Sequence, residues 1–182
     1  MHISIEDIII RNATQNDVEA LYSWWNDGRI MAHAGYPLGL KITKDQIINQ
    51  LKMESDINGI RLIIEQNKQS IGEMVYRTKV DNIAEIGIKI CDISKQNKGL
   101  GSIILNKYIN CLFNEYNYQK IILSTDKKNN RAQYVYEKLG FEIISIEEDA
   151  WINQIGEKVS VVNYEILKSK YNKRFAPDSS LS

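Results

Sequence analysis

The residues with the most informative spacing are the glycines of the loop Gln96-Asn97-Lys98-Gly99-Leu100-Gly101-Ser102. An isoleucine-rich run, 85–90, precedes this loop, and a long apolar-rich run, 103–113, follows it. A strand, a short glycine loop and a helix bring backbone amides together at a helix N-terminus, where unpaired N–H groups and the helix dipole favour an anion. Glycine also lets such a ligand approach the backbone closely. The pattern predicts a phosphate site, although an ordinary helix start can carry the same glycines.

Two well-known phosphate loops do not fit this stretch. A P-loop needs Lys followed by Ser or Thr directly after its last glycine, whereas Gly101 is followed by Ser102 and Ile103. A dinucleotide-binding loop needs a third glycine, and Ile104 occupies that position. The loop therefore offers amides and little else, which suits a pyrophosphate bound without magnesium chemistry.

Composition limits the possible partners. The 182 residues are enough for one domain, and 23 Lys plus Arg balance 23 Asp plus Glu, which argues against a general nucleic-acid binder. Cys91 and Cys111 lie far apart in apolar surroundings, as small hydrophobic residues of a reducing compartment do. Neither a leader nor an apolar run of about 20 residues is evident, so we expect a cytoplasmic protein without a membrane partner.

The elements that must position the loop follow from hydrophobic periodicity and turn residues. We expect an α+β (mixed α/β) domain over residues 1–167, with a central, mostly antiparallel sheet and helices on both faces. Residues 168–182 should form a tail that is flexible at its end. The expected order is β-α-α-β-β-β-α-β-α-β-β. Its strands are 5–11, 60–66, 70–78, 82–90, 120–124, 141–146 and 159–167, and its helices start near Thr14, Thr43, Ile103 and Asn129.

A second stretch carries a family resemblance. Residues 129–141, Asn-Asn-Arg-Ala-Gln-Tyr-Val-Tyr-Glu-Lys-Leu-Gly-Phe, fill every fixed position of an Asn-x-x-Ala-x-x-x-Tyr-x-Lys-x-Gly-Phe signature. Together with the glycine loop and the element order, this stretch resembles the GNAT superfamily of acetyl-CoA-dependent N-acetyltransferases, over roughly residues 8–167. Within it, 84–87 and 150–152 look most like the group that acetylates ribosomal-protein N-termini, although polyamine and aminoglycoside acetyltransferases share these features.

The resemblance implies a cofactor site for acetyl-CoA, without a metal ion. Backbone groups of Ile88 and Ile90 would contact the pantetheine arm as an added strand does. The loop from Gln96 to Ser102 would hold the CoA pyrophosphate through its amides. Asn129 would hydrogen-bond the pantetheine region, and Tyr136 would protonate the departing thiolate.

Amide transfer needs a proton acceptor as well as this acid. Tyr136 is protonated at neutral pH because the reference pKa of tyrosine is about 10. Glu85 and Glu73 could each act as the base, directly or through a water; we prefer Glu85 because it precedes the strand that would contact CoA. His33 could border the acceptor pocket. Basic residues around the loop should attract the CoA phosphates collectively: Lys95, Lys98, Lys127, Lys128 and Arg131.

The function that follows is acetyl transfer from acetyl-CoA to a primary amine by direct attack, with a protein N-terminal amine as one acceptor. A polyamine or an aminoglycoside is an alternative acceptor, although residues 28–40 contain Arg29 and His33 and no carboxylate. A non-catalytic acyl-CoA-binding sensor is the alternative of another class, but it would not need Tyr136. By analogy with the family, the apolar final strands would permit a homodimer.

Overall fold

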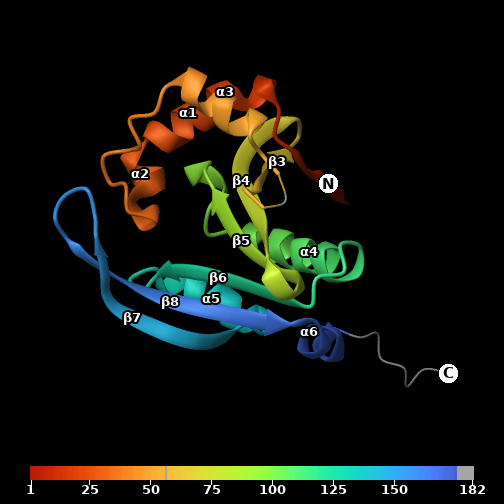
Figure 1. Cartoon of the computed structure of the whole chain (residues 1–182). Helices are drawn as coiled ribbons and strands as arrows, with labels where there is room; N and C mark the ends of the chain where they lie inside the picture. The colour runs from red at the N-terminus through yellow and green to blue at the C-terminus, as the bar shows by residue number, and fades with distance from the viewer. Residues whose placement is uncertain (56, 176–182) are drawn as a thin grey trace.

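The computed structural model describes residues 1–55 and 57–175 of the chain. In these residues, eight strands form one sheet in the order β1-β2-β3-β4-β5-β6-β8-β7 (Figure 1). All neighbours are antiparallel except β5 and β6, which confirms the mostly antiparallel sheet. The strands are β1 (His2–Ile5), β2 (Ile8–Asn12), β3 (Ile60–Gln66), β4 (Gln69–Lys79), β5 (Ile83–Ile90), β6 (Lys120–Asp126), β7 (Glu142–Ile152) and β8 (Lys158–Leu167).

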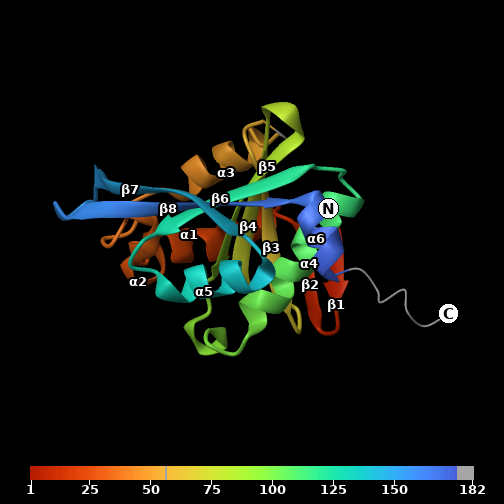
Figure 2. The ribbon, with the colours of Figure 1, turned by 90° about the horizontal axis from the view of Figure 1, so that it is seen from below.

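Helices cover both faces of the sheet, as expected (Figure 2). The larger core lies under α4 and α5, and a smaller core lies under the first three helices. Alternate residues of each central strand enter the two cores: Met74 faces the larger one, and Ile63 faces the smaller one. The helices are α1 (Val18–Asn26), α2 (Gly28–Met31), α3 (Lys44–Lys52), α4 (Leu100–Asn114), α5 (Asn130–Leu139) and α6 (Lys168–Phe175). Single 3₁₀ turns are η1 (Gln15–Asp17), η2 (Ala32–Ala34), η3 (Val80–Asn82) and η4 (Ile93–Lys95).

The junction between β5 and β6 is short. Only three residue pairs join these parallel strands, Ile83–Glu85 with Lys120–Ile122, although both strands continue further. Figure 1 shows β6, β8 and β7 running in a clearly different direction from β3, β4 and β5. The sheet therefore opens after Glu85, and the edge of β5 beyond that residue has no strand beside it within the described residues.

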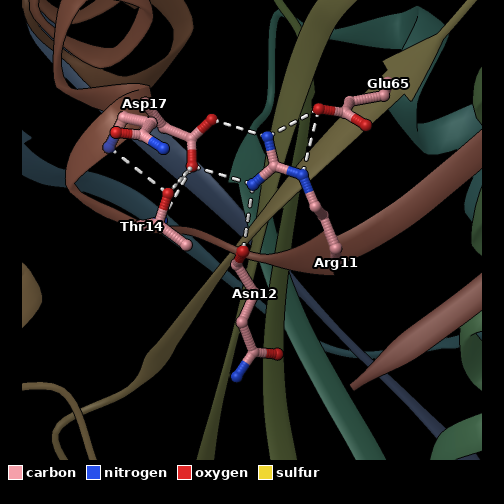
Figure 3. A network of polar contacts seen from close by, with 6 residues as sticks. Arg11, Asn12, Thr14, Asp17 and Glu65 are labelled. Carbon is pink, nitrogen blue, oxygen red and sulfur yellow. Dashed lines mark hydrogen bonds and ion pairs between the residues drawn. The ribbon is translucent and has the colours of Figure 1, made fainter. Parts of the chain in front are cut away.

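A polar network fixes the start of α1 against the sheet (Figure 3). The Arg11 guanidinium donates to both carboxylate oxygens of Asp17, at 2.8 and 2.7 Å, and to Glu65 Oε1 at 2.6 Å. Asp17 in turn accepts from the Thr14 amide at 2.7 Å, while the Thr14 side chain caps the turn as predicted. This arrangement places α1, and with it Trp25, over β3 and β4.

The chain ends differ from the sequence-based expectation. Residues 5–11, expected as one strand, belong to a hairpin of β1 and β2 that turns at Glu6, whose φ is 51°. Beyond residue 167 the chain continues as α6, whose Tyr171 is buried and donates to the Asn106 carbonyl at 3.0 Å. The end predicted to be flexible, 176–182, lies outside the described residues.

Candidate acyl-transfer site

The glycine loop leads into α4 as predicted, but the helix begins at Leu100, earlier than the start near Ile103 that was expected. Gly99 is the residue before the first helical turn and has a φ of 75°, a left-handed conformation that glycine adopts without strain. A Cβ added at Gly101 would meet no atom of another part of the fold within 4 Å. The Ser102 and Ile103 amides donate to the Gly99 carbonyl at 3.1 and 3.4 Å, so the amides that precede them in the loop are the candidates for binding an anion.

Side chains from two neighbouring elements fix the loop. Gln96 donates from Nε2 to the Ile90 carbonyl at 2.8 Å, which ties the loop to the end of β5. Arg131, in the first turn of α5, donates to Gln96 Oε1 at 3.2 Å and to Asn97 Oδ1 at 3.0 Å. The first turn of α5 thus lies beside the start of α4, and Arg131 adds a positive charge there.

Both residues predicted to contact the pantetheine arm lie along the opening between β5 and β6. Ile88 and Ile90 both follow Glu85 on β5, so they lie where β6 has left the sheet. An extended ligand can add to such an edge through main-chain hydrogen bonds, as an extra strand would. The sheet supplies this edge beside the glycine loop.

Two predicted residues lie on or just before α5. Asn129 caps the helix, with Oδ1 accepting from the Ala132 amide at 3.2 Å. Tyr136 is 8% exposed and packs edge-on against Tyr164, with ring centroids 5.6 Å apart. Burial raises the pKa of the Tyr136 phenol to about 12, and its hydroxyl has no hydrogen-bond partner among the described residues. The phenol therefore keeps its proton at neutral pH, and no described group accepts a hydrogen bond from it.

Glu85 lies at the last residue pair of the β5–β6 junction. Its side chain is 36% exposed and accepts from Lys79 Nζ at 2.7 Å, with Arg77 Nη1 at 3.9 Å. It points to the same face of β5 as Gly87 and Lys89, because side chains alternate along a strand. Glu85 is thus solvent-accessible and lies next to the point where the sheet opens.

Glu73 occupies a very different environment on the same face. Its side chain is 6% exposed and contacts three donors: Trp25 Nε1 at 3.0 Å, Arg61 Nη1 at 2.7 Å and Lys89 Nζ at 3.3 Å. Burial alone would raise the pKa of Glu73, but the charges of Arg61 and Lys89 and the Trp25 hydrogen bond outweigh it, so this pKa lies below its ordinary value. Glu73 is therefore an ionised, fully engaged carboxylate.

A cavity of about 240 Å³ lies on this face, between β3, β4 and β5. Its charged wall contains Glu73 and the three cations that sequence analysis did not single out: Arg61, Arg77 and Lys89. Gly87 and Ile88 of β5 also line it. The cavity therefore touches the strand segment that follows the β5–β6 junction, from the face opposite α4 and α5.

The sequence contained a signal for these cations. Glu73, Val75 and Arg77 alternate along β4, and Glu85, Gly87 and Lys89 alternate along β5, so one face of both strands carries charge. The antiparallel register pairs Glu73 with Lys89 and Arg77 with Glu85. Charges at a period of two in otherwise apolar strands indicate a polar cavity on that face.

The segment after α1 closes over this region. Met31 Sδ lies 2.9 Å from Lys89 Nζ, and η2 lies against β6, so this segment spans the two diverging strands. Gly35, with a φ of 90°, packs directly on the Trp151 ring at the β7–β8 hairpin. Gln154 of that hairpin accepts from the Leu38 amide at 3.0 Å and donates to the Gly39 carbonyl at 2.9 Å. Figure 1 shows this hairpin beside α2.

The remaining candidates make no charged contact with the cavity residues within the part of the chain that the structure describes. His33 is exposed in η2. Cys91 and Cys111 are buried free thiols, in agreement with their predicted hydrophobic role. No group of three or more His, Cys, Asp or Glu side chains in residues 1–55 and 57–175 could hold a metal ion. No helix in these same two ranges is long and apolar enough to cross a bilayer.

Comparisons with known proteins agree with the fold. Two aminoglycoside N(6')-acetyltransferases of type 1, from Klebsiella pneumoniae and Serratia marcescens, are each 26% identical over 152 residues, or 76% of either chain. The spermidine N-acetyltransferase of Vibrio cholerae, solved with CoA and spermine, superposes with a TM-score of 0.80 at 22% identity, covering 92% of this chain and 99% of that one. A GNAT-family acetyltransferase of Bacillus anthracis gives 0.77 at 21% identity, covering 93% and 99%.

The family model described as the acetyltransferase (GNAT) domain matches residues 7–142, from β2 to the start of β7. This range includes the glycine loop, the β5–β6 opening and the Asn129–Phe141 signature. The chain therefore belongs to the GNAT family of acetyltransferases.

Proposed function

We propose that the protein transfers an acetyl group from acetyl-CoA to a primary amine by direct attack, within a complex of both substrates. The observation that carries this proposal is the opening of β5 from β6 after Glu85, next to the amide-rich start of α4. The pyrophosphate would lie on the amides from Asn97 to Ser102, and the pantetheine arm would run along Ile88 and Ile90. Asn129 would contact the arm from the start of α5.

The reaction needs four groups at the opening. A neutral amine attacks the thioester carbonyl, a backbone amide near Ile88 stabilises the oxyanion, a base takes the amine proton, and the thiolate leaves with a proton from an acid. Tyr136 suits the acid because burial keeps its phenol protonated and its hydroxyl makes no other hydrogen bond among the described residues.

Glu85 suits the base better than Glu73. Burial opposes ionisation of Glu73, but Arg61, Lys89 and Trp25 outweigh it and occupy the carboxylate oxygens, which makes Glu73 a poor proton acceptor. Glu85 is accessible and lies two residues before Gly87 on the same face of the strand, so its carboxylate could serve an amine at the opening directly or through a water. Glu85→Gln should lower kcat with little change in the affinity for acetyl-CoA. Glu73→Gln should instead lower the stability of the folded protein. Equal kcat losses at matched stability would contradict this assignment.

The acceptor class is a second part of the proposal. A protein N-terminal amine and a small amine both fit the chemistry, and the relatives named above act on small amines.

The homodimer also remains a proposal. β7 is the outer strand of the sheet, and every one of its residues is exposed, which leaves an edge that a second copy could cover. Light scattering would measure the oligomeric state. The free thiols of Cys91 and Cys111 favour a reducing, cytoplasmic location.

The test is release of free CoA thiol from acetyl-CoA across an acceptor panel. The panel holds Ala- and Ser-initiated peptides, spermidine, aminoglycosides and small amino acids. Release well above the rate without acceptor supports transfer and identifies the acceptor class. Binding of acetyl-CoA by calorimetry without release to any acceptor would contradict the enzyme assignment and favour a sensor.

A further inference from the structure

More cations than carboxylates line the cavity beside the β5–β6 opening. Its wall contains three cations, Arg61, Arg77 and Lys89, and one carboxylate, Glu73. They come from three neighbouring strands and share the face that carries Gly87, so an acceptor that reaches the opening from this face passes between them. The charge of this cavity therefore bears directly on which amines can enter.

The single carboxylate is already neutralised. Glu73 accepts from Trp25, Arg61 and Lys89 and is almost completely enclosed, so it cannot also bind a cationic ligand without losing one of these partners. The Arg61 guanidinium lies over the Trp25 ring, 4.5 Å from its centroid, which holds it in place. Lys89 shares its ammonium between Glu73 and the Met31 sulfur.

Arg77 is the cation with the weakest protein partner. Its guanidinium is 3.9 Å from Glu85, which Lys79 holds at 2.7 Å, and its Nε donates to the Asn58 carbonyl at 3.3 Å. At 39% side-chain exposure it is the most accessible of the three cavity cations. A guanidinium with free donors in a partly enclosed cavity is suited to a bidentate contact with an oxyanion.

We propose that the acceptor is a small primary amine that also carries an oxyanion, in the simplest case a carboxylate, and that Arg77 binds this group with Lys89 and Arg61 beside it. This inference rests on the proposed function and narrows its acceptor class. The volume of about 240 Å³ lies just below the roughly 300–1,000 Å³ of sites for drug-sized ligands, so only a small acceptor would fit. Polyamines and aminoglycosides, by contrast, would bring several positive charges toward a wall in which cations outnumber carboxylates.

Matched acceptor pairs test the inference. β-Alanine and β-alaninamide differ in the carboxylate alone, phosphoethanolamine and ethanolamine test a phosphate as the oxyanion, and spermidine represents the polycations. Each is measured in two ways: by calorimetric binding to the CoA-saturated protein, and by kcat/KM from thiol release. The wild-type protein should prefer an anionic member over its partner by about 10- to 100-fold, the range of a charge-assisted hydrogen bond.

Variants then assign the preference to Arg77. Arg77→Gln should bring the ratio within each pair close to one, and Arg77→Lys should restore part of it. Ratios within one variant cancel any general effect on turnover or folding. Lys44→Gln removes an equal charge from α3, where Lys44 pairs with Glu19 outside the cavity, and should leave the ratio unchanged.

The two measurements separate the inference from the proposed function. Discrimination in binding without thiol release would support the oxyanion site and contradict acetyl transfer. Thiol release with equal use of both members of each pair, or with spermidine as the best acceptor, would support transfer and overturn the oxyanion site. A wild-type preference that survives in Arg77→Gln would also overturn it.

Discussion

Asp17→Asn should destabilise the protein substantially, because this buried carboxylate connects α1 to the sheet. Asp17 is 4% exposed and accepts four hydrogen bonds, two from Arg11 and two from Thr14. An asparagine keeps one acceptor oxygen and turns an NH₂ group toward donors. Removing one partner of a buried ion pair costs about 3–5 kcal/mol, and a lost helix cap costs about 1 kcal/mol.

The observed loss should be near the lower end of this range. Arg11 keeps its contact with Glu65 at 2.6 Å and is partly exposed, so its charge is not stranded. We therefore expect a loss of about 3 kcal/mol in the free energy of unfolding, which lowers the urea midpoint by roughly 1–3 M. Urea titration followed by tryptophan fluorescence measures this change, since Trp24 and Trp25 both lie on α1.

Glu19→Gln is the matched control on the same helix. Glu19 is 75% exposed and pairs with Lys44, so its loss should cost at most about 0.5 kcal/mol.

The pH dependence of the Asp17→Asn effect adds a second criterion. Burial acts to raise the pKa of Asp17, but Arg11 and Thr14 outweigh it, so the folded-state pKa is lowered. The stabilisation is thus present above the unfolded pKa of about 4 and is lost as the pH falls through the folded value. A cost equal to that of the control, or one that persists unchanged in acid, would refute the role of this network.

Three further predictions concern the site. Gly101→Val should weaken CoA binding in calorimetry by tenfold or more without loss of stability, because valine has a higher helix propensity than glycine and a Cβ at this position has no other part of the fold within 4 Å. Unchanged affinity would contradict the pyrophosphate assignment. Tyr136→Phe should lower kcat by about 10²-fold or more at nearly constant CoA affinity, and wild-type turnover would exclude Tyr136 as the acid. Gly35→Ala should cost about 2–4 kcal/mol in urea titrations, because its Cβ would overlap the Trp151 ring at 1.7 Å. Gly156→Ala is the control, because Gly156 has a similar positive φ but no neighbour within 4 Å of an added Cβ, and it should cost only about 1 kcal/mol of unfolding free energy. Equal losses for Gly35→Ala and Gly156→Ala would show that backbone strain alone, without the Trp151 overlap, causes the effect.

Local patterns explain why much of the fold was predictable from sequence. Thr14 and Thr43 cap helices through side chains three residues away, and Gly99 precedes a helix, so each signal lies within a few residues of its consequence. The β1–β2 turn was missed because Glu6 is not a typical turn residue and Asp7 alone is a weak turn signal between apolar runs; the pairing of the two strands decides their boundary.

The charged cavity depends on contacts that no single segment reveals. Arg61, Glu73 and Lys89 come together only after three strands have paired in one register, and Trp25 reaches Glu73 from a helix 48 residues away. Trp25 looks like an ordinary core residue in the sequence. Burial and hydrogen-bond partners distinguish Glu73 from Glu85, and both depend on how the strands pair. For that reason the sequence alone could not decide which of the two carboxylates is the base.

The three-pair junction between β5 and β6 also has a consequence for amide hydrogen exchange. Amides from Ile86 to Ile90 that point toward the opening have no neighbouring strand among the described residues, so solvent deuterium should reach them without unfolding of the sheet. An extended molecule lying along this edge would close that route and slow their exchange. Protection factors at these few residues would therefore report how fully the opening is filled, whichever acceptor the protein uses.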